Sequence, residues 1–158
     1  KKSIARIRTI SHELAPPDVI AFGIVDALRD YVERMEQGGR LGADFEYEGP
    51  ENNKTNLPLP DQMNVYRLSL EVLNNVVKHG QCNYLKVYVQ LSTNVLKIEI
   101  LHDGKGITND EAASLTEQSK GLGLKSIQSR LLLLGASIHY QTESELSTIA
   151  ITIPVNHA

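Results

Sequence analysis

The stretch Asp61–His79, DQMNVYRLSLEVLNNVVKH, decides the fold, because it predicts one long helix that other elements must cover. Glu71, Asn74, Asn75 and Lys78 recur at positions i, i+3, i+4 and i+7 and therefore share one face. Apolar residues crowd the other faces, so the helix is expected to be largely buried and its polar groups to need partners. The alternative is an exposed polar face with a Glu71–Lys78 contact.

Sequence signals mark both ends of this helix. Asp61 is a candidate N-cap, and Gly80 stands where a left-handed C-terminal residue belongs. Downstream, apolar residues alternate with polar ones in Tyr84–Leu91 and Val95–Leu101. The short connection between these two stretches predicts an antiparallel hairpin with one buried face.

A glycine-containing turn, Leu101-His102-Asp103-Gly104-Lys105-Gly106-Ile107, follows the second strand. Glycine at these positions lets the backbone approach a ligand closely. An ordinary Asp-Gly turn is the alternative interpretation.

A second pair of glycines opens the last helix, in Lys120-Gly121-Leu122-Gly123-Leu124-Lys125-Ser126. The first N–H groups of a helix lack internal partners, so such a terminus favours an anion, and phosphate most of all. This helix is expected over about 123–134, after a loop over 102–120. Ala136–Thr142 and Ser147–Pro154 then predict a final hairpin.

The N-terminal part adds helices and one strand. Lys1–Leu14 has a helical apolar stripe that Pro16-Pro17 ends. A second helix is predicted from Asp18, its candidate N-cap, to Gln37; its apolar face is listed as Val19, Phe22, Val25, Leu28 and Val32. A strand over 41–48 and a loop over 49–60 complete the order ααβαββαββ. This order predicts an α+β fold, a two-layer sandwich of one sheet and one helical layer.

Composition excludes several classes of protein. The 158 residues carry 16 Lys+Arg and 19 Asp+Glu, a net charge of −3 that argues against a nucleic-acid partner. The single cysteine, Cys82, excludes an internal disulfide and a cysteine-based zinc cluster. No apolar run reaches the roughly 18 residues of a membrane span, so this chain is expected to make no membrane contact. The start at Lys1 without methionine or signal peptide predicts a fragment of a longer protein.

Three motifs in this order, a helical E-x-x-x-N, a strand followed by DGxG, and GxG at a helix start, resemble one known superfamily. It is the GHKL (Bergerat-fold) ATP-binding superfamily shared by sensor histidine kinases, gyrases, heat-shock chaperones and mismatch-repair ATPases. Within it, residues 61–154 resemble a bacterial sensor histidine kinase: 71–79 resemble the N box, 102–106 the G1 box and 120–124 the G2 box. Residues 10–28 resemble the linker helices of the subgroup of nitrate sensors and desaturase-regulating thermosensors. The resemblance implies a mixed, mostly antiparallel sheet.

The resemblance also implies roles on the central helix. Asn75 is expected to ligate Mg²⁺ through its side-chain oxygen. Lys78 and His79 are expected near the phosphates of ATP. Glu71 aligns with the carboxylate that activates water in the ATPases, and in a kinase it is expected to polarise the attacking histidine.

The glycine-containing motifs receive roles in the same way. Asp103 is expected to accept a hydrogen bond from the adenine amino group, with Gly104 and Gly106 clearing room for the base. Gly121 and Gly123 are expected to border a short mobile lid over 107–120 and to let the backbone meet the phosphates. The expected nucleotide-contacting set also includes Ile107, Leu122 and Leu124. Two departures from the family pattern are a missing F box and Ser147-Thr148 where the family has Gly-Thr.

His12 lies in a sequence, Ser11-His12-Glu13-Leu14, that resembles the phosphoacceptor H box. Too few residues separate it from the first strand to complete a two-helix hairpin, so His12 is not expected to accept phosphate. Residues 1–14 are expected to end the second hairpin helix, and 15–158 to form the catalytic domain. His102, His139 and His157 are expected to be structural.

The resemblance implies transfer of the ATP γ-phosphoryl group to a histidine on a dimerisation hairpin, followed by relay to a response regulator. It implies ATP and Mg²⁺ as substrate and cofactor, a homodimer of the full-length protein through the hairpin, and a cytoplasmic location, with membrane attachment left open. Two alternatives stay open: another GHKL ATPase or an anti-sigma-factor serine kinase, and a non-catalytic nucleotide-binding module. The stimulus and the cognate regulator lie outside the sequence.

Overall fold

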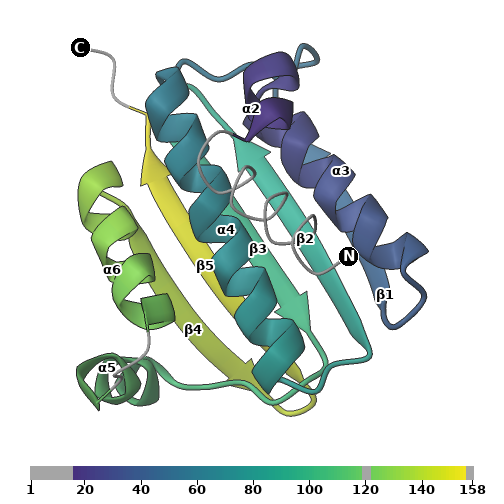
Figure 1. Cartoon of the computed structure of the whole chain (residues 1–158), viewed down its shortest axis with the longest axis vertical. Coiled ribbons are helices and arrows are strands. Elements are labelled where there is room, and N and C mark those ends of the chain that lie inside the picture. Colours follow the sequence, from purple (N-terminus) through teal and green to yellow (C-terminus); the bar gives the residue numbers. More distant parts are fainter. Residues whose placement is uncertain (1–15, 119–121, 156–158) are drawn as a thin grey trace, which may run out of the picture.

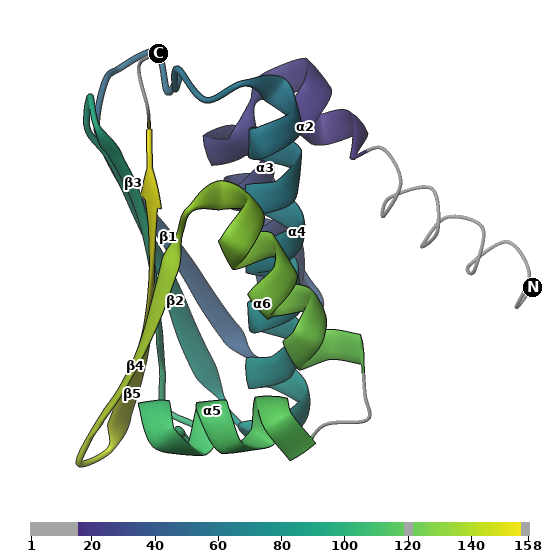
Figure 2. The same cartoon turned by 90° about the vertical axis from the view of Figure 1, so that its left-hand side faces the viewer.

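Five strands form one open sheet in the order β1-β2-β3-β5-β4, and the helices cover one of its faces (Figures 1 and 2). This computed structural model describes residues 16–118 and 122–155. The strands are β1 (Gly42–Glu48), β2 (Tyr84–Leu91), β3 (Val95–His102), β4 (Ser137–Glu143) and β5 (Leu146–Pro154). The helices are α2 (Pro17–Phe22), α3 (Ile24–Gln37), α4 (Leu59–His79), α5 (Asn109–Gln118) and α6 (Leu122–Leu134).

The sheet is mixed and mostly antiparallel. β1 runs parallel to β2, whereas the β2–β3, β3–β5 and β4–β5 pairs are antiparallel. Its core-facing residues follow the predicted alternation; on β2 and β3 these buried residues are Leu85, Val87, Val89, Leu96, Ile98 and Ile100. Burial of this face against the helices stabilises the sandwich. The predicted α+β class and two-layer architecture are confirmed.

Helix α4 forms the centre of the helical layer (Figure 1). The side chains that it buries are Val65, Tyr66, Leu68, Ser69, Val72, Leu73 and Val76. It begins at Leu59 after Pro58, not at Asp61, because Pro60 is compatible with the first helical turn, where its missing N–H needs no partner. Gly80 is right-handed (φ −80°), and the positive φ falls instead on Gln81 (φ 52°), so the expected left-handed glycine is wrong.

The helix predicted from Asp18 to Gln37 is broken at Gly23, whose φ of 82° is incompatible with a continuous helix. Gln62 Oε1 on α4 accepts a hydrogen bond from the Ile24 N–H (3.2 Å) at the start of α3. The break turns Phe22 outward, where it is 67% exposed instead of lying on the predicted apolar face. Asp18 does not cap the helix, because α2 begins one residue earlier, at Pro17.

Helix α5 lies where the sequence predicted only a loop, and it crosses one end of the helical layer (Figure 2). A reciprocal cap starts it: Thr108 Oγ1 accepts from the Glu111 N–H (3.1 Å), and Glu111 Oε2 accepts from the Thr108 N–H (2.7 Å). This capping box supplies partners for N–H groups that a helix start leaves unpaired. The expectation of an irregular segment over 102–120 is therefore wrong for Asn109–Gln118.

Two further features concern the surface. At the outer edge of the sheet, the Ala43 N–H of β1 donates to the Glu36 side chain of α3.

Within the described ranges, the helices are too short or too polar to cross a bilayer. The proposed hairpin remnant over 1–14, including His12, lies outside the described residues.

Candidate nucleotide-binding site

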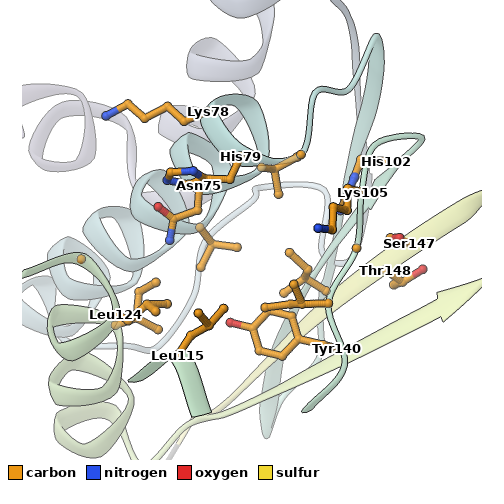
Figure 3. A pocket seen from close by; sticks show the side chains of 18 of the residues that line it. Asn75, Lys78, His79, His102, Lys105, Leu115, Leu124, Tyr140, Ser147 and Thr148 are labelled. Atoms are coloured by element: carbon orange, nitrogen blue, oxygen red, sulfur yellow. The ribbon is translucent and has the colours of Figure 1, made fainter. Parts of the chain in front are cut away.

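A cavity of about 580 Å³ lies between the C-terminal half of α4, the sheet, and helices α5 and α6 (Figure 3). The helices contribute to its wall Val72, Asn75, Val76, Lys78, His79, Leu115, Gly123, Leu124 and Ile127. The strands and loops contribute Gly80, His102, Lys105, Gly106, Ile107, Tyr140, Gln141, Ser147, Thr148 and Ile149. A mostly apolar hollow with a few polar groups around it is the usual form of a small-molecule site.

The polar groups of α4 separate into those inside and those outside the cavity. Asn75 is half-buried and points its amide into the hollow, whereas the Lys78 ammonium points away from it (Figure 3). Asn74 lies outside the wall, where its Oδ1 accepts a hydrogen bond from the Tyr31 hydroxyl (3.3 Å). The four polar residues of the helix therefore do not all point into the cavity.

Glu71 lies one turn before Asn75 and is not part of the cavity wall. Its Oε2 is buried and accepts no hydrogen bond from any described residue. The structure contains no Glu71–Lys78 ion pair, so the alternative of a solvated polar face held by that contact is wrong. A buried carboxylate oxygen without a hydrogen-bond partner costs free energy, and native proteins contain few such atoms.

Asp103 faces away from the cavity. Its Oδ1 accepts hydrogen bonds from the backbone N–H groups of Asn83 (2.8 Å) and Tyr84 (3.0 Å). These bonds, that of Tyr84 first, hold the pKa of the Asp103 carboxyl below its usual range. The side chain thus joins the end of β3 to the start of β2, and this geometry does not place it against a base.

His102 stands in the cavity wall instead, although it was expected to be only structural. The side chain is 2% exposed, and its Nδ1 accepts the Gly104 N–H (3.2 Å). Burial lowers the pKa of the imidazole, against a smaller opposing effect of Asp103, so the ring is neutral at pH 7. A signal for this position was present in the sequence: residue 102 is in phase with the buried Leu96, Ile98 and Ile100, and residue 103 is not.

The two glycines of this loop serve packing within the protein. A Cβ on Gly104 would lie 2.3 Å from the Gly80 carbonyl oxygen, and one on Gly106 would lie 2.1 Å from Ser147 Oγ. The backbone is fastened here by the Lys105 N–H, which donates to the Gly80 carbonyl (2.6 Å). Only Gly106 also lines the cavity, so the expectation that both glycines clear room for a base is not supported by their surroundings.

The remaining expected residues fall into two groups. Lys78, His79, Ile107, Gly123 and Leu124 line the cavity, whereas Gly121 lies outside the described residues and the side chain of Leu122 is not described.

Lys105, Tyr140, Ser147 and Thr148 also line the cavity, though none was assigned a role from the sequence. Tyr140 points its hydroxyl into the hollow from β4 (Figure 3), and burial raises the pKa of its phenol.

Known proteins resemble this chain in sequence and in fold. Residues 60–157 match the family described as histidine kinase-, DNA gyrase B-, and HSP90-like ATPase. The signal transduction histidine-protein kinase/phosphatase DegS of Brevibacillus brevis is 26% identical over 157 residues, which cover 98% of this chain and 38% of DegS. The sensor histidine kinase ComP of Bacillus subtilis (strain 168) is 29% identical over 148 residues, 88% of this chain and 17% of ComP. The chain thus spans less than two fifths of either relative.

Solved structures share the fold. The histidine kinase domain of the blue-light activated kinase of Erythrobacter litoralis EL346 superposes with a TM-score of 0.63 at 18% identity, covering 84% of this chain and 65% of that chain. The catalytic domain of histidine kinase ThkA superposes with a TM-score of 0.65 at 13% identity, covering 84% and 90%. The chain belongs to the histidine kinase-, DNA gyrase B- and HSP90-like ATPase family, and the two relatives named above are histidine kinases.

Proposed function

We propose that the cavity binds ATP with Mg²⁺ and that the domain transfers the γ-phosphoryl group to a histidine on a two-helix hairpin elsewhere in the protein. The phosphoryl group then passes to an aspartate of a response regulator. The observation that carries this proposal is the half-buried Asn75 amide, which points into a largely apolar cavity and has no partner among the described residues. Residues 1–14 end the hairpin and 15–158 form the catalytic domain of a cytoplasmic, dimeric kinase.

The donor set fits Mg²⁺ better than a metal held by protein alone. The described residues contain no cluster of three or more His, Cys, Asp or Glu side chains that would form a cage. Mg²⁺ typically uses one or two protein oxygens together with substrate phosphates and water, and the Asn75 side-chain oxygen supplies one such ligand. When bound, Mg²⁺ neutralises charge on the phosphates during transfer.

The other polar residues provide positioning and charge. Lys105 lines the cavity, and its positive charge favours the phosphates. The Lys78 ammonium points away from the hollow and contributes only at longer range. Glu71, one turn from Asn75, polarises the attacking imidazole as a general base. Catalysis in phosphoryl transfer comes mainly from such positioning and charge stabilisation.

Nucleotide titrations with Asn75→Ala test the site. We expect the affinity for ATP in the presence of Mg²⁺ to fall by tenfold or more, since an interaction with a charged group contributes roughly 1.5–3 kcal/mol. Asn74→Ala is the matched control: it removes an amide from the adjacent position, loses the Tyr31 contact, and should leave ATP binding unchanged. Equal affinities for wild type and Asn75→Ala would contradict the proposed metal site.

Phosphoryl transfer is tested with radiolabelled ATP. Because His12 is not the acceptor in this proposal, residues 1–158 alone should remain unlabelled. A separately produced hairpin that carries the acceptor histidine should become labelled when the domain is added. Acid-labile label on the isolated chain that disappears in His12→Gln would show that the acceptor has been misplaced.

A further inference from the structure

The end of β3 presents one side chain to the cavity and the next to the opposite side. His102 lines the cavity, whereas Asp103 is fastened to the backbone N–H groups of Asn83 and Tyr84. A single-residue step along a strand reverses the direction of the side chain, so one of these two residues can face a ligand and the other cannot. The observed register also sets His102 directly opposite Ser147 on β5, whose hydroxyl-bearing side chain lines the same cavity.

The hydrogen bonds of His102 fix which ring nitrogen carries the proton. Nδ1 accepts the Gly104 N–H, so in the neutral ring Nδ1 holds the lone pair and Nε2 holds the hydrogen. No described residue bonds Nε2, and this nitrogen is not among the buried polar atoms that lack a partner. Nε2 therefore retains access to the cavity that the residue lines, and it presents an N–H donor there.

We propose that His102 is the residue of this chain that reads the nucleotide base, by donating its Nε2–H to an acceptor on the purine ring edge. This inference rests on the proposed function, because it requires that the cavity bind a nucleoside triphosphate. The acceptor is N1 of adenine or the 6-oxo oxygen of a 6-oxopurine. The Ser147 hydroxyl donates to Thr142 Oγ1 (3.4 Å) and keeps a lone pair, which can accept from the 6-amino group of adenine or from the N1–H of a 6-oxopurine.

A donor at this place has a consequence for specificity. A carboxylate accepts from the 6-amino group of adenine and repels a 6-oxo oxygen, so it selects adenine strongly. The neutral imidazole finds an acceptor on both types of purine and leaves no group unpaired with either. Sites discriminate strongly only where the wrong ligand leaves a buried polar group without its partner. The wild-type domain should therefore discriminate weakly between ATP and ITP, which differ at the 6-position and the N1 proton but share the rest of the molecule.

The test measures dissociation constants of ATP and ITP, each with Mg²⁺, for the wild-type chain and His102→Asp. Wild type should bind the two nucleotides within about fivefold of one another. His102→Asp should shift the ratio of affinities towards ATP by about tenfold or more, because the carboxylate accepts from the amino group only. Asp103→Asn is the matched control: it changes the adjacent carboxylate and should leave the ratio as in wild type.

Two amide substitutions at the same position keep the proposal testable if the buried carboxylate of His102→Asp prevents folding. The amide of His102→Asn retains an acceptor near Nδ1 and deletes the Nε2 position, so both nucleotides should bind about tenfold more weakly. The longer His102→Gln places an amide N–H near the Nε2 position and should bind both within about threefold of wild type.

Several results would overturn the inference while leaving nucleotide binding established. These are a wild-type preference for ATP over ITP greater than tenfold, an affinity ratio that His102→Asp leaves unchanged, or a His102→Asn variant that binds both nucleotides as tightly as wild type. A ratio altered by Asp103→Asn alone would assign base reading to Asp103. Absence of binding of either nucleotide to the folded wild-type chain would overturn the proposed function and this inference with it.

Discussion

The loop after β3 and helix α5 border the same cavity, but the protein holds them in opposite ways. The loop is fastened through backbone and side chain: Asp103 accepts two backbone N–H groups, and the Lys105 N–H donates to the Gly80 carbonyl. Helix α5 buries Ala112, whereas its Leu115, which lines the cavity, is 46% exposed. A segment with little buried apolar surface opens at a lower free energy than one packed into the core.

The loop after β3 and helix α5 therefore suit different roles at the cavity. The wall that carries His102 is fastened by the hydrogen bonds of Asp103 and Lys105. Pre-organisation of this kind would favour the base contact proposed for His102. At the start of α5, Asn109 Oδ1 accepts the Tyr140 N–H (2.8 Å) and Asn109 Nδ2 contacts His139 Nδ1 (3.1 Å). On the proposed function, His102 would contact the base from the fastened wall, and helix α5 would act as a cover that opens for the ligand.

The largest expected effect comes from breaking the rigid side. Gly104→Ala would place a Cβ 2.3 Å from the Gly80 carbonyl oxygen, and backbone must shift to relieve this contact. We expect a loss of roughly 2–3 kcal/mol in the free energy of unfolding, measured by urea denaturation. Gly123→Ala is the matched control, because nothing lies within 4 Å of its Cβ position in α6. It should be neutral or stabilising by up to about 1 kcal/mol; equal destabilisation by both changes would contradict the close packing of the loop.

A smaller effect is expected from pH, again on the rigid side. Burial lowers the pKa of His102 in the folded state below its ordinary value of 6.5, while the nearby Asp103 opposes the shift. The unfolded chain therefore binds a proton more readily, so the contribution of the neutral ring is present above about pH 6.5 and is lost as the pH falls below it. Unfolding free energies at about pH 7.5 and about pH 5.5 should decrease less in His102→Gln than in wild type. An identical decrease in both proteins would show that His102 does not titrate in this window.

The smallest effect on global stability is expected from weakening the attachment of helix α5 to β4. Asn109→Ala removes the side chain that joins α5 to β4, and should lower the free energy of unfolding by no more than about 1 kcal/mol. Hydrogen exchange of the α5 amides should nevertheless become several-fold faster, with α4 unaffected. Glu117→Ala, an exposed position on the same helix, is the control. In wild type, α5 should exchange faster than α4 and slow down on addition of Mg²⁺ and ATP; protection equal to that of α4 without nucleotide would contradict the comparison.

Strands and the central helix could be predicted from the sequence because their signals are periodic and their environment is simple. Alternating apolar residues in Tyr84–Leu91 and Val95–Leu101 allow one buried face, and the structure buries it. The break at Gly23 was missed because a glycine within a helical pattern is tolerated in many helices. Here tertiary structure decides, since Gln62 of α4 supplies an acceptor to the new helix start.

The site was predicted in outline, and for one residue the motif match and the strand phase lead to different predictions. The motifs located the α4 and loop walls, and Asn75 and Gly106 both line the cavity. The motif match assigned base contact to the only carboxylate in the turn, Asp103. The strand phase would have assigned it to His102, because alternation continues to the last residue of β3. Helix α5 was missed because its capping box, Thr108 and Glu111, lies in a polar segment without a clear apolar stripe.

The contacts of Glu36 and Asn109 bear on self-association, because these two side chains accept hydrogen bonds from backbone N–H groups of the two outermost strands. The outward N–H of Ala43 on β1 and that of Tyr140 on β4 already have side-chain acceptors from α3 and α5. An unprotected strand edge pairs readily with another chain and leads to aggregation. A second copy could extend the sheet at these points only by displacing Glu36 or Asn109. Because Asn109 lies on α5, which also contributes Leu115 to the cavity wall, movement of α5 away from β4 would expose the Tyr140 N–H at this strand edge.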